Sequence, residues 1–224
     1  DATWAADKFI DYFKNFTNLE EYLRAVKKAV ITSSSQLQDP KEDFFNMDIH
    51  PEEMEFDIRL VGARFPNSIQ QDYYKSLLRS VSSHNNEDNI PGRELRLMVY
   101  EKNSNKVVGF IRLQSPLINS KPRNEWLGKP PDLKIFNRHA VMGFAIVPSQ
   151  PFGYNYLGGK LLALICVSHF VREKLNEVFE KDIALFETTS LYGSSSSASQ
   201  YDGLKPFMRF KGLTDSKFIP TLYS

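Results

Sequence analysis

The order of strand-like and helix-like segments after residue 55 is the feature that most limits how this chain can fold. Five segments combine apolar and β-branched residues in the manner of strands, and they span 56–62, 94–102, 106–116, 139–148 and 182–191. Apolar residues at helical spacing predict helices over 67–81, capped by Asn67 or Ser68, and over 158–179, with a short helix or helix plus loop in 199–210. This order is not that of a doubly wound Rossmann sheet, and it predicts an α+β domain.

The first quarter of the chain has a different character. Residues 1–31 carry apolar side chains at three- and four-residue steps and predict a helical hairpin that is broken near 15–18. Residues 33–53 are acidic, contain prolines and lack a regular apolar pattern, which is typical of a connector. We therefore divide the chain into an N-terminal helical extension with its connector, 1–53, and a domain over 54–224.

Composition limits the class of protein. With 224 residues, 42% of them hydrophobic, the chain can bury a large core without disulfides. Its only cysteine, Cys166, lies in an apolar run and is expected in that core. No apolar segment approaches the roughly 20 residues that span a bilayer, so we expect a soluble protein of a reducing compartment, with no membrane partner. The net charge is only +1, but bases predominate between residues 106 and 138, a stretch that could face an anion or nucleic acid.

The stretch GYNYLGGK, 153–160, precedes the apolar helix and is the strongest candidate for an anion site. It is not a Walker A loop, since glycine stands where that loop has its lysine, and it is not a G-x-G-x-x-G fingerprint. A helix N-terminus with free N–H groups still binds anions. The candidate cofactor-binding residues are Gly153, Asn155, Gly158, Gly159 and Lys160. The alternative is that the glycines only permit close helix-to-strand packing.

The element order over 56–218 is similar to the acyl-coenzyme A N-acyltransferase (GNAT-like) fold, which has a mixed, mostly antiparallel splayed sheet flanked by helices. In that family a [QR]-x-x-G-x-[GA] loop follows the central strand and holds the pyrophosphate of coenzyme A. With Gly158 as the first glycine of the loop, Asn155 and Lys160 depart from the pattern at two of its three positions. The resemblance implies acyl-coenzyme A or another anionic acyl donor as cofactor.

The C-terminal part, 138–212, resembles a second family, that of the Druantia anti-phage defence protein A. The resemblance rests on a strand led by an arginine and ending in proline, an Asn-x-Leu loop, a Glu-Thr strand end, a tyrosine and a glycine turn. Here these are Arg138, Val147 with Pro148, Asn155 with Leu157, Glu187 with Thr188, Tyr201 and Gly212. It implies a phage-related role in the cytoplasm of a bacterial host cell. At the level of the fold, the phage DNA-modification protein Mom is similar too.

Polar side chains at the end of the last strand are candidates for catalysis. Glu187 continues an apolar row of that strand, where partial burial would raise its pKa and suit it to act as a general base. A salt bridge at the sheet edge is the alternative. The resemblance to acyltransferases implies that Tyr192 or Tyr201, which follow the strand, acts as the proton donor, and Thr188 and Ser190 are candidate substrate contacts.

Arginines and a tryptophan complete the candidate site. Arg112 and Arg138 are placed on or beside central strands, where an arginine needs an anion or an acidic partner such as Glu94 or Glu187. Trp126, near Arg123, suits base stacking beside phosphate contacts, although many tryptophans are packing anchors. The histidines show no metal-binding spacing, so no metal is expected.

Two functions follow from these residues. The first is an acyltransferase-like enzyme that transfers an acyl-type group to an amine in nucleic acid or a nucleotide. The second is a non-catalytic nucleic-acid-binding module on the same fold, whose phosphate contacts and stacking ring are Lys121, Arg123, Trp126, Lys129, Lys205, Arg209 and Lys211. Substitution of Glu187 should abolish the activity of an enzyme but leave the affinity of a binding module unchanged. Added salt should weaken the binding of nucleic acid by such a module. The oligomeric state is left open.

Overall fold

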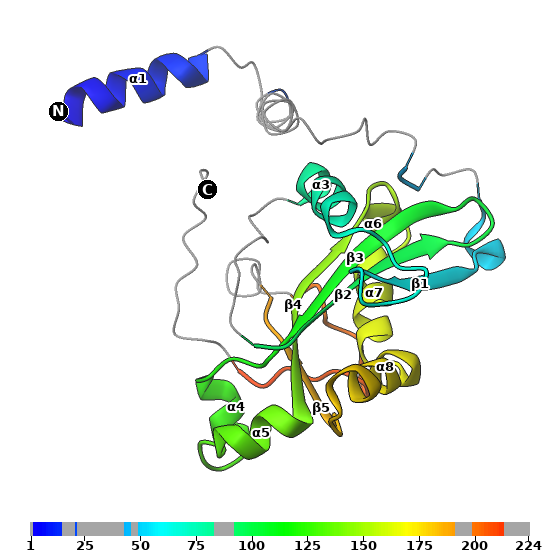
Figure 1. Cartoon of the computed structure of the whole chain (residues 1–224). Helices are drawn as coiled ribbons and strands as arrows, with labels where there is room; N and C mark the ends of the chain where they lie inside the picture. Colours follow the sequence, from blue (N-terminus) through cyan, green and yellow to red (C-terminus); the bar gives the residue numbers. More distant parts are fainter. Residues whose placement is uncertain are drawn as a thin grey trace.

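The protein is built around one open five-stranded sheet, and helices cover both of its faces (Figure 1). The computed structural model describes residues 2–14, 21, 43–45, 49–82, 92–190 and 199–212. The strands are β1 Phe56–Leu60, β2 Glu94–Glu101, β3 Lys106–Gln114, β4 Ala140–Pro148 and β5 Leu185–Thr188. The helices are α1 Ala2–Lys14, the 3-10 turn η2 Pro51–Glu53, α3 Gln71–Val81, α4 Lys121–Trp126, α5 Leu133–His139, α6 Phe152–Asn155, α7 Gly158–Cys166 and α8 His169–Phe179. The expected α+β class is confirmed.

The strands lie in the order β1-β2-β3-β4-β5, so each pairs with its neighbour in sequence. The first four are antiparallel, and the expected hairpin joins β2 to β3. Strand β5 is parallel to β4, and the pairing runs only from Ala140 opposite Leu185 to Gly143 opposite Thr188. The second half of β4 therefore continues past the end of β5, and the sheet is open beside it.

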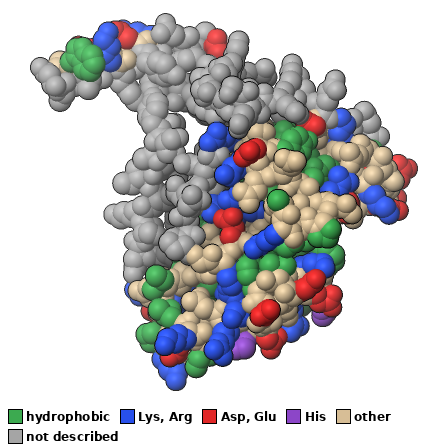
Figure 2. Space-filling view, viewed as in Figure 1, with side chains coloured by type: hydrophobic (Ala, Val, Ile, Leu, Met, Phe, Trp, Pro, Cys, Tyr) green, Lys and Arg blue, Asp and Glu red, His purple; other side chains and the backbone are tan. Residues whose placement is uncertain are grey.

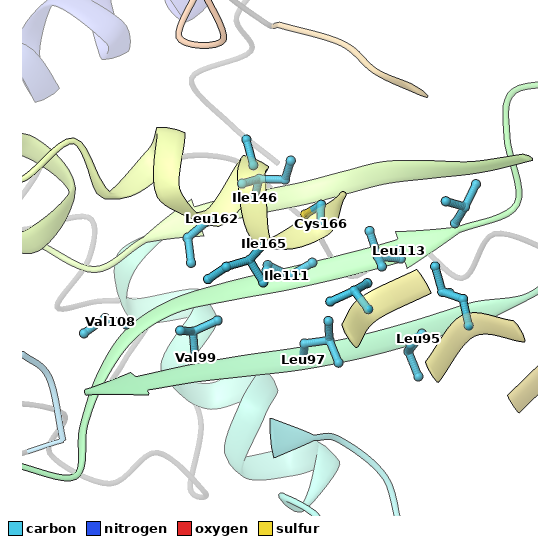
Figure 3. Packing of buried hydrophobic residues seen from close by; sticks show 14 of the residues in the cluster. Leu95, Leu97, Val99, Val108, Ile111, Leu113, Ile146, Leu162, Ile165 and Cys166 are labelled. Atoms are coloured by element: carbon cyan, nitrogen blue, oxygen red, sulfur yellow. The ribbon is translucent and has the colours of Figure 1, made fainter. Parts of the chain in front are cut away.

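Two apolar clusters, one on each face, hold the helices to the sheet. On β2, Leu95, Leu97 and Val99 belong to the cluster of α7 and α8, whereas Met98 and Tyr100 belong to the cluster of α3. This alternation is the period of two that a strand buried on both faces requires. Figure 3 shows the side chains that α7 and the strands contribute to the larger cluster.

Helix α7 packs closely on β3 at one point. Leu162 of α7 is fully buried, and a Cβ on Gly109 of β3 would overlap its side chain. Cys166, on the same helix, is 3% exposed, which confirms its expected place in the core. Burial raises the pKa of this thiol, so it stays protonated at neutral pH.

Two predicted helices differ in their bounds. Helix α3 begins at Gln71, not near 67, because Ile69 pairs with Val61 and extends the edge of β1. The single helix predicted over 158–179 is divided into α7 and α8, since the Ser168 side chain accepts a hydrogen bond from the Val171 N–H and starts a new helix.

Two segments were predicted with the wrong structure. The stretch 118–134, expected to be irregular, contains α4 and the start of α5, which the Asp132 side chain caps. Because α5 extends to His139, β4 begins at Ala140 and not at residue 139. The helix expected within 199–210 is replaced by a series of turns.

The N-terminal helix α1 ends at Lys14, close to the break predicted at 15–18. The rest of the predicted hairpin, apart from residue 21, lies outside the described residues, as does most of the connector 33–53. Within that connector, Phe45 is 3% exposed, packs in the larger cluster and donates its N–H to Val107 O at 3.0 Å. No helix in the described part of the chain is long and apolar enough to cross a membrane.

Candidate functional site

The predicted anion loop is not an open loop. Gly153 and Asn155 lie in the one-turn helix α6, and α7 begins at Gly158. Leu157 lies between the two helices with a left-handed φ of 54°, so α6 does not continue into α7 as one helix. Helix α7 therefore starts beside the end of β4, where the sequence places it, but fewer residues than expected are available to surround a ligand.

The glycines of this stretch divide into packing and open positions. A Cβ on Gly158 would overlap the ring of Phe152, and a Cβ on Gly153 would lie 2.7 Å from Pro148 Cγ. Gly159 is different, because the nearest atom to its Cβ would be Pro148 Cγ at 3.9 Å. The packing alternative thus holds for Gly153 and Gly158, and Gly159 is the glycine that leaves space near the start of α7.

The C-terminal segment meets the start of α7 and the end of β5. Lys160 Nζ donates to the backbone carbonyl of Asp202 at 2.5 Å. Tyr201 is partly buried against the core, and burial raises its pKa, an effect that the nearby side chains of Thr188 and Gln200 oppose. Tyr201, Thr188 and Lys160 are thus brought together beside the opening next to β4. Ser190 follows β5 and is half-buried, and Tyr192 lies outside the described residues.

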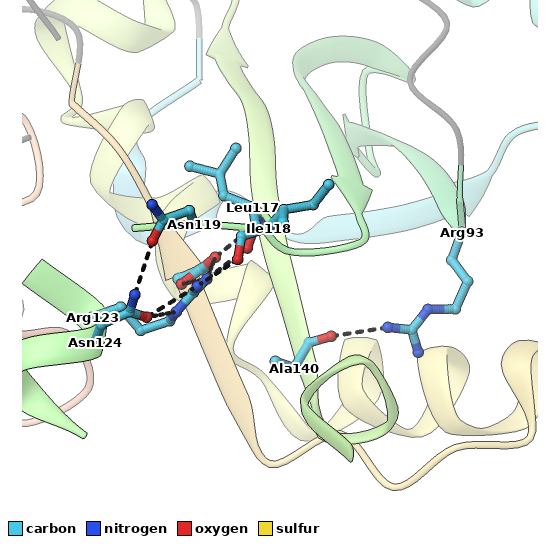
Figure 4. A network of polar contacts seen from close by, with 8 residues as sticks. Arg93, Leu117, Ile118, Asn119, Arg123, Asn124 and Ala140 are labelled. Carbon is cyan, nitrogen blue, oxygen red and sulfur yellow. Dashed lines mark hydrogen bonds and ion pairs between the residues drawn. The ribbon is translucent and has the colours of Figure 1, made fainter. Parts of the chain in front are cut away.

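Glu187 precedes Thr188 on β5, and its carboxylate is bound by Arg123 of α4. Arg123 is 5% exposed, and its Nη1 donates to Glu187 Oε1 at 3.1 Å and to Leu117 O at 2.7 Å (Figure 4). Its Nη2 donates to Ile118 O at 3.2 Å, and the guanidinium lies 4.5 Å from the ring centroid of Phe136. The expectation that Arg123 contacts substrate is not met in this arrangement, because its donors are engaged inside the protein.

The Glu187 carboxyl has little freedom to act as a base in this arrangement. It accepts from Arg123 and from the Leu117 N–H at 3.2 Å, which is the salt bridge that the sequence left as the alternative. Burial raises its pKa, against the opposite effects of Arg123 and the Leu117 N–H. Glu187 and Thr188 are successive residues of a strand, so their side chains point to opposite faces. Tyr201 lies near Thr188, so Glu187 and Tyr201 are not placed side by side.

The other two arginines have separate environments. Arg112 is 1% exposed and its Nε donates to Glu94 Oε2 at 2.6 Å, so the predicted pairing with Glu94 is confirmed. Arg96 shares the same carboxylate at 2.8 Å. Arg138 was placed on or beside a strand by the sequence, but it lies exposed in the last turn of α5, because α5 extends to residue 139.

Cations and aromatic rings are exposed together on α4, α5 and the C-terminal segment. Trp126 ends α4 and is 53% exposed, and Lys211 Nζ lies 4.1 Å from its ring centroid. We call this region the basic-aromatic surface, and its members are Lys121, Trp126, Lys129, Lys134, Arg138, Lys205, Phe207, Arg209, Phe210 and Lys211. Figure 2 shows basic and apolar side chains gathered over α4 and α5.

Phe207 and Phe210 belong to this surface, although the sequence pattern did not indicate them. The helix expected over 199–210 would have buried them, whereas the turns leave them 68% and 72% exposed. The signal that could have identified them is KPFMRFK, 205–211, in which cations are interspersed with aromatic rings and a proline interrupts the helical pattern.

Alanine at the two neighbouring glycines should have opposite effects. We expect Gly158→Ala to lower the free energy of unfolding by about 1–3 kcal/mol, because the added methyl group overlaps the buried Phe152 ring. Gly159→Ala should leave it unchanged or raise it by up to about 1 kcal/mol, because alanine favours the helix. Urea denaturation of both variants measures this difference. Equal effects of the two substitutions would show that Gly158 is not a packing position.

The pH dependence of Glu187→Gln tests whether burial or the ion pair controls this carboxyl. Because burial raises its pKa in the folded chain, its contribution to stability is complete below the ordinary value and is lost as the pH rises through the folded-state value. The unfolding free energy of the wild type minus that of the variant should therefore fall as the pH rises above about 4, the ordinary value for a glutamate, and through the higher folded-state pKa. Urea denaturation at each pH measures it, with the exposed Glu125→Gln as control. A rise in this difference would mean that the ion pair dominates.

Comparison with known proteins identifies the family of the chain. The family model of Druantia protein DruA matches residues 7–200, far more of the chain than the stretch 138–212 that carries the sequence resemblance. No curated protein and no solved structure matches the chain, so its likeness to acyltransferases and to Mom stays a prediction. The chain therefore belongs to the family of Druantia protein A, of the Druantia anti-phage defence system.

Proposed function

We propose that this member of the Druantia protein A family binds nucleic acid through the basic-aromatic surface. The observation that carries the proposal is the local charge. The exposed residues of 121–138 and 199–212 include seven bases and three acids, Glu125, Asp132 and Asp202, which gives an excess of four positive charges (7 − 3 = 4). The whole chain has a net charge of only +1, so the rest of the protein is acidic on balance.

Such a distribution favours a polyanion as partner. Phosphate groups attract clustered lysines and arginines and release counterions, which supplies most of the sequence-independent affinity for nucleic acid. Two contacts fix this surface to the domain. Arg123 binds α4 to Glu187 of β5, and Gly212 packs closely on Pro122 of α4, where an added Cβ would lie 3.1 Å from Pro122 Cβ. In an anti-phage system, the natural candidate is nucleic acid of the invading phage.

A second candidate function is acyl-type transfer to an amine of that nucleic acid, and the opening beside β4 favours it. An anionic donor such as acyl-coenzyme A would place a phosphate at the N–H groups of Gly158 and Gly159, near the Lys160 ammonium. The acceptor amine would displace the thiolate of the donor, Tyr201 would protonate the thiolate, and Glu187 would accept the amine proton. The last step requires Glu187 to leave Arg123. Because Glu187 and Tyr201 lie on opposite sides of β5, it also requires a water molecule to carry the amine proton to Glu187.

The salt dependence of binding tests the first function. Lys129→Gln and Lys134→Gln should each weaken binding of a labelled oligonucleotide and reduce the slope of log K against log salt by about 0.7–0.9. Fluorescence anisotropy at several salt concentrations measures the slope. The control is Lys102→Gln, since Lys102 adjoins the β2–β3 turn at the other end of the sheet and should change nothing. Binding that is insensitive to salt, or equally weakened by Lys102→Gln, would contradict the proposal.

Thermal denaturation with coenzyme A and acetyl-coenzyme A tests the second function. We expect the ligands to raise the Tm of the wild type and of Gly159→Ala, but not that of Gly159→Asp, because a carboxylate at the open glycine repels the phosphate. Gly159 is the better site for this test than Gly158, whose substitution disturbs packing. An unchanged Tm of the wild type at saturating ligand would exclude coenzyme A as the donor.

A further inference from the structure

We propose that the nucleic acid bound by this protein is single-stranded, with its bases stacked on the exposed rings of Trp126, Phe207 and Phe210. This inference rests on the proposed nucleic-acid binding and names the class of ligand. The rings are 53%, 68% and 72% exposed, respectively. Large aromatic side chains gain free energy from burial, so three exposed rings in one region indicate a binding surface.

The C-terminal segment presents its rings outward for a structural reason. Tyr201, Leu204 and Met208 pack against the larger core cluster. The Met208 N–H donates to Leu204 O at 3.0 Å, which closes a turn, and Lys160 holds the Asp202 carbonyl. Phe207 lies between the anchors Leu204 and Met208, and Phe210 follows Met208. Both rings face solvent. The segment is a fixed platform and not a helix that could enter the major groove of a duplex.

Cations accompany each ring. Lys205, Arg209 and Lys211 are interspersed with Phe207 and Phe210, and no acidic residue lies between 203 and 212. Lys211 also lies 4.1 Å from the Trp126 ring centroid, which brings the C-terminal segment and α4 into one surface. Protein–protein interfaces are depleted in lysine, whereas single-stranded nucleic acids bind where aromatic rings alternate with cations. The composition thus favours a single strand over a protein partner.

The exposed rings also distinguish a single strand from a duplex. In a duplex the faces of the bases are stacked on one another, and a protein reaches only phosphates and base edges. In a single strand the faces are free to stack on aromatic side chains without regard to sequence. A surface that bound a duplex by its phosphates would need the lysines and arginines but not the three rings.

The test compares labelled oligothymidine with a blunt duplex of the same length, about 20 nucleotides, by fluorescence anisotropy. The variant is Phe207→Leu with Phe210→Leu, which keeps the apolar side chains but removes the stacking faces. We expect it to weaken oligothymidine binding at least about tenfold, to leave the salt slope unchanged and to have little effect on the duplex. Phe170→Leu is the control, since Phe170 is an exposed ring on α8.

Trp126 gives an independent readout. Trp4 and Trp126 are the only tryptophans of the chain, so in a Trp4→Phe background the fluorescence reports on Trp126 alone. Oligothymidine should quench this fluorescence, and the duplex should not.

Three results would overturn the proposal. Equal binding of both oligonucleotides, with no effect of the leucine variant, would leave nucleic-acid binding in place but refute stacking. A lack of binding to either would refute the proposed function as well. Self-association of the wild type in sedimentation, lost in the variant without any change in oligothymidine binding, would assign the rings to a protein interface.

Discussion

The buried ion pair between Arg123 and Glu187 fixes the end of the sheet from which the basic-aromatic surface projects. Arg123 lies on α4 and Glu187 on β5, 64 residues later, so the pair joins two segments that are far apart in the sequence. The same guanidinium donates to Leu117 O and Ile118 O and lies over Phe136 of α5. A buried guanidinium is costly unless its donors are satisfied, and here one side chain satisfies its donors by bringing α4, α5 and β5 together.

A second fixed point lies at the start of α7. Leu162 packs over Gly109, and Phe152 packs over Gly158. Neither contact leaves room for an additional methyl group, so close packing sets the position of α7 on the sheet. The first turn of α7 then carries Lys160, which holds the carbonyl of Asp202. The C-terminal segment is thus tied to the core on one side and to α4 on the other. Rings and cations held in this way lose little conformational entropy when a ligand binds.

The sequence predicted the strands well because their signal is local. Strands β2, β3 and β4 are largely buried and β1 and β5 are partly buried, so their residues show the apolar pattern that predicts a strand. Long-range pairs such as Arg123 with Glu187 leave no such pattern, and the sequence could offer Glu187 only as a base or as part of a salt bridge. The error over 199–210 has a physical cause: Tyr201, Leu204 and Met208 have helical spacing and do pack on the core, but turns connect them. The sequence placed the stretch 153–160 at the start of α7, where the structure has it, but it did not indicate the exposure of Phe207 and Phe210.

Photo-crosslinking tests the central claim, that the basic-aromatic surface is where nucleic acid binds, most directly. A single-stranded oligonucleotide containing 5-iodouracil would be bound to the full chain, irradiated, and the crosslinked peptides identified by mass spectrometry. The account predicts crosslinks at Trp126, Phe207 and Phe210, because iodouracil reacts with the aromatic ring on which it stacks. Crosslinks confined to α3 or to the α7–α8 face of the sheet would contradict it.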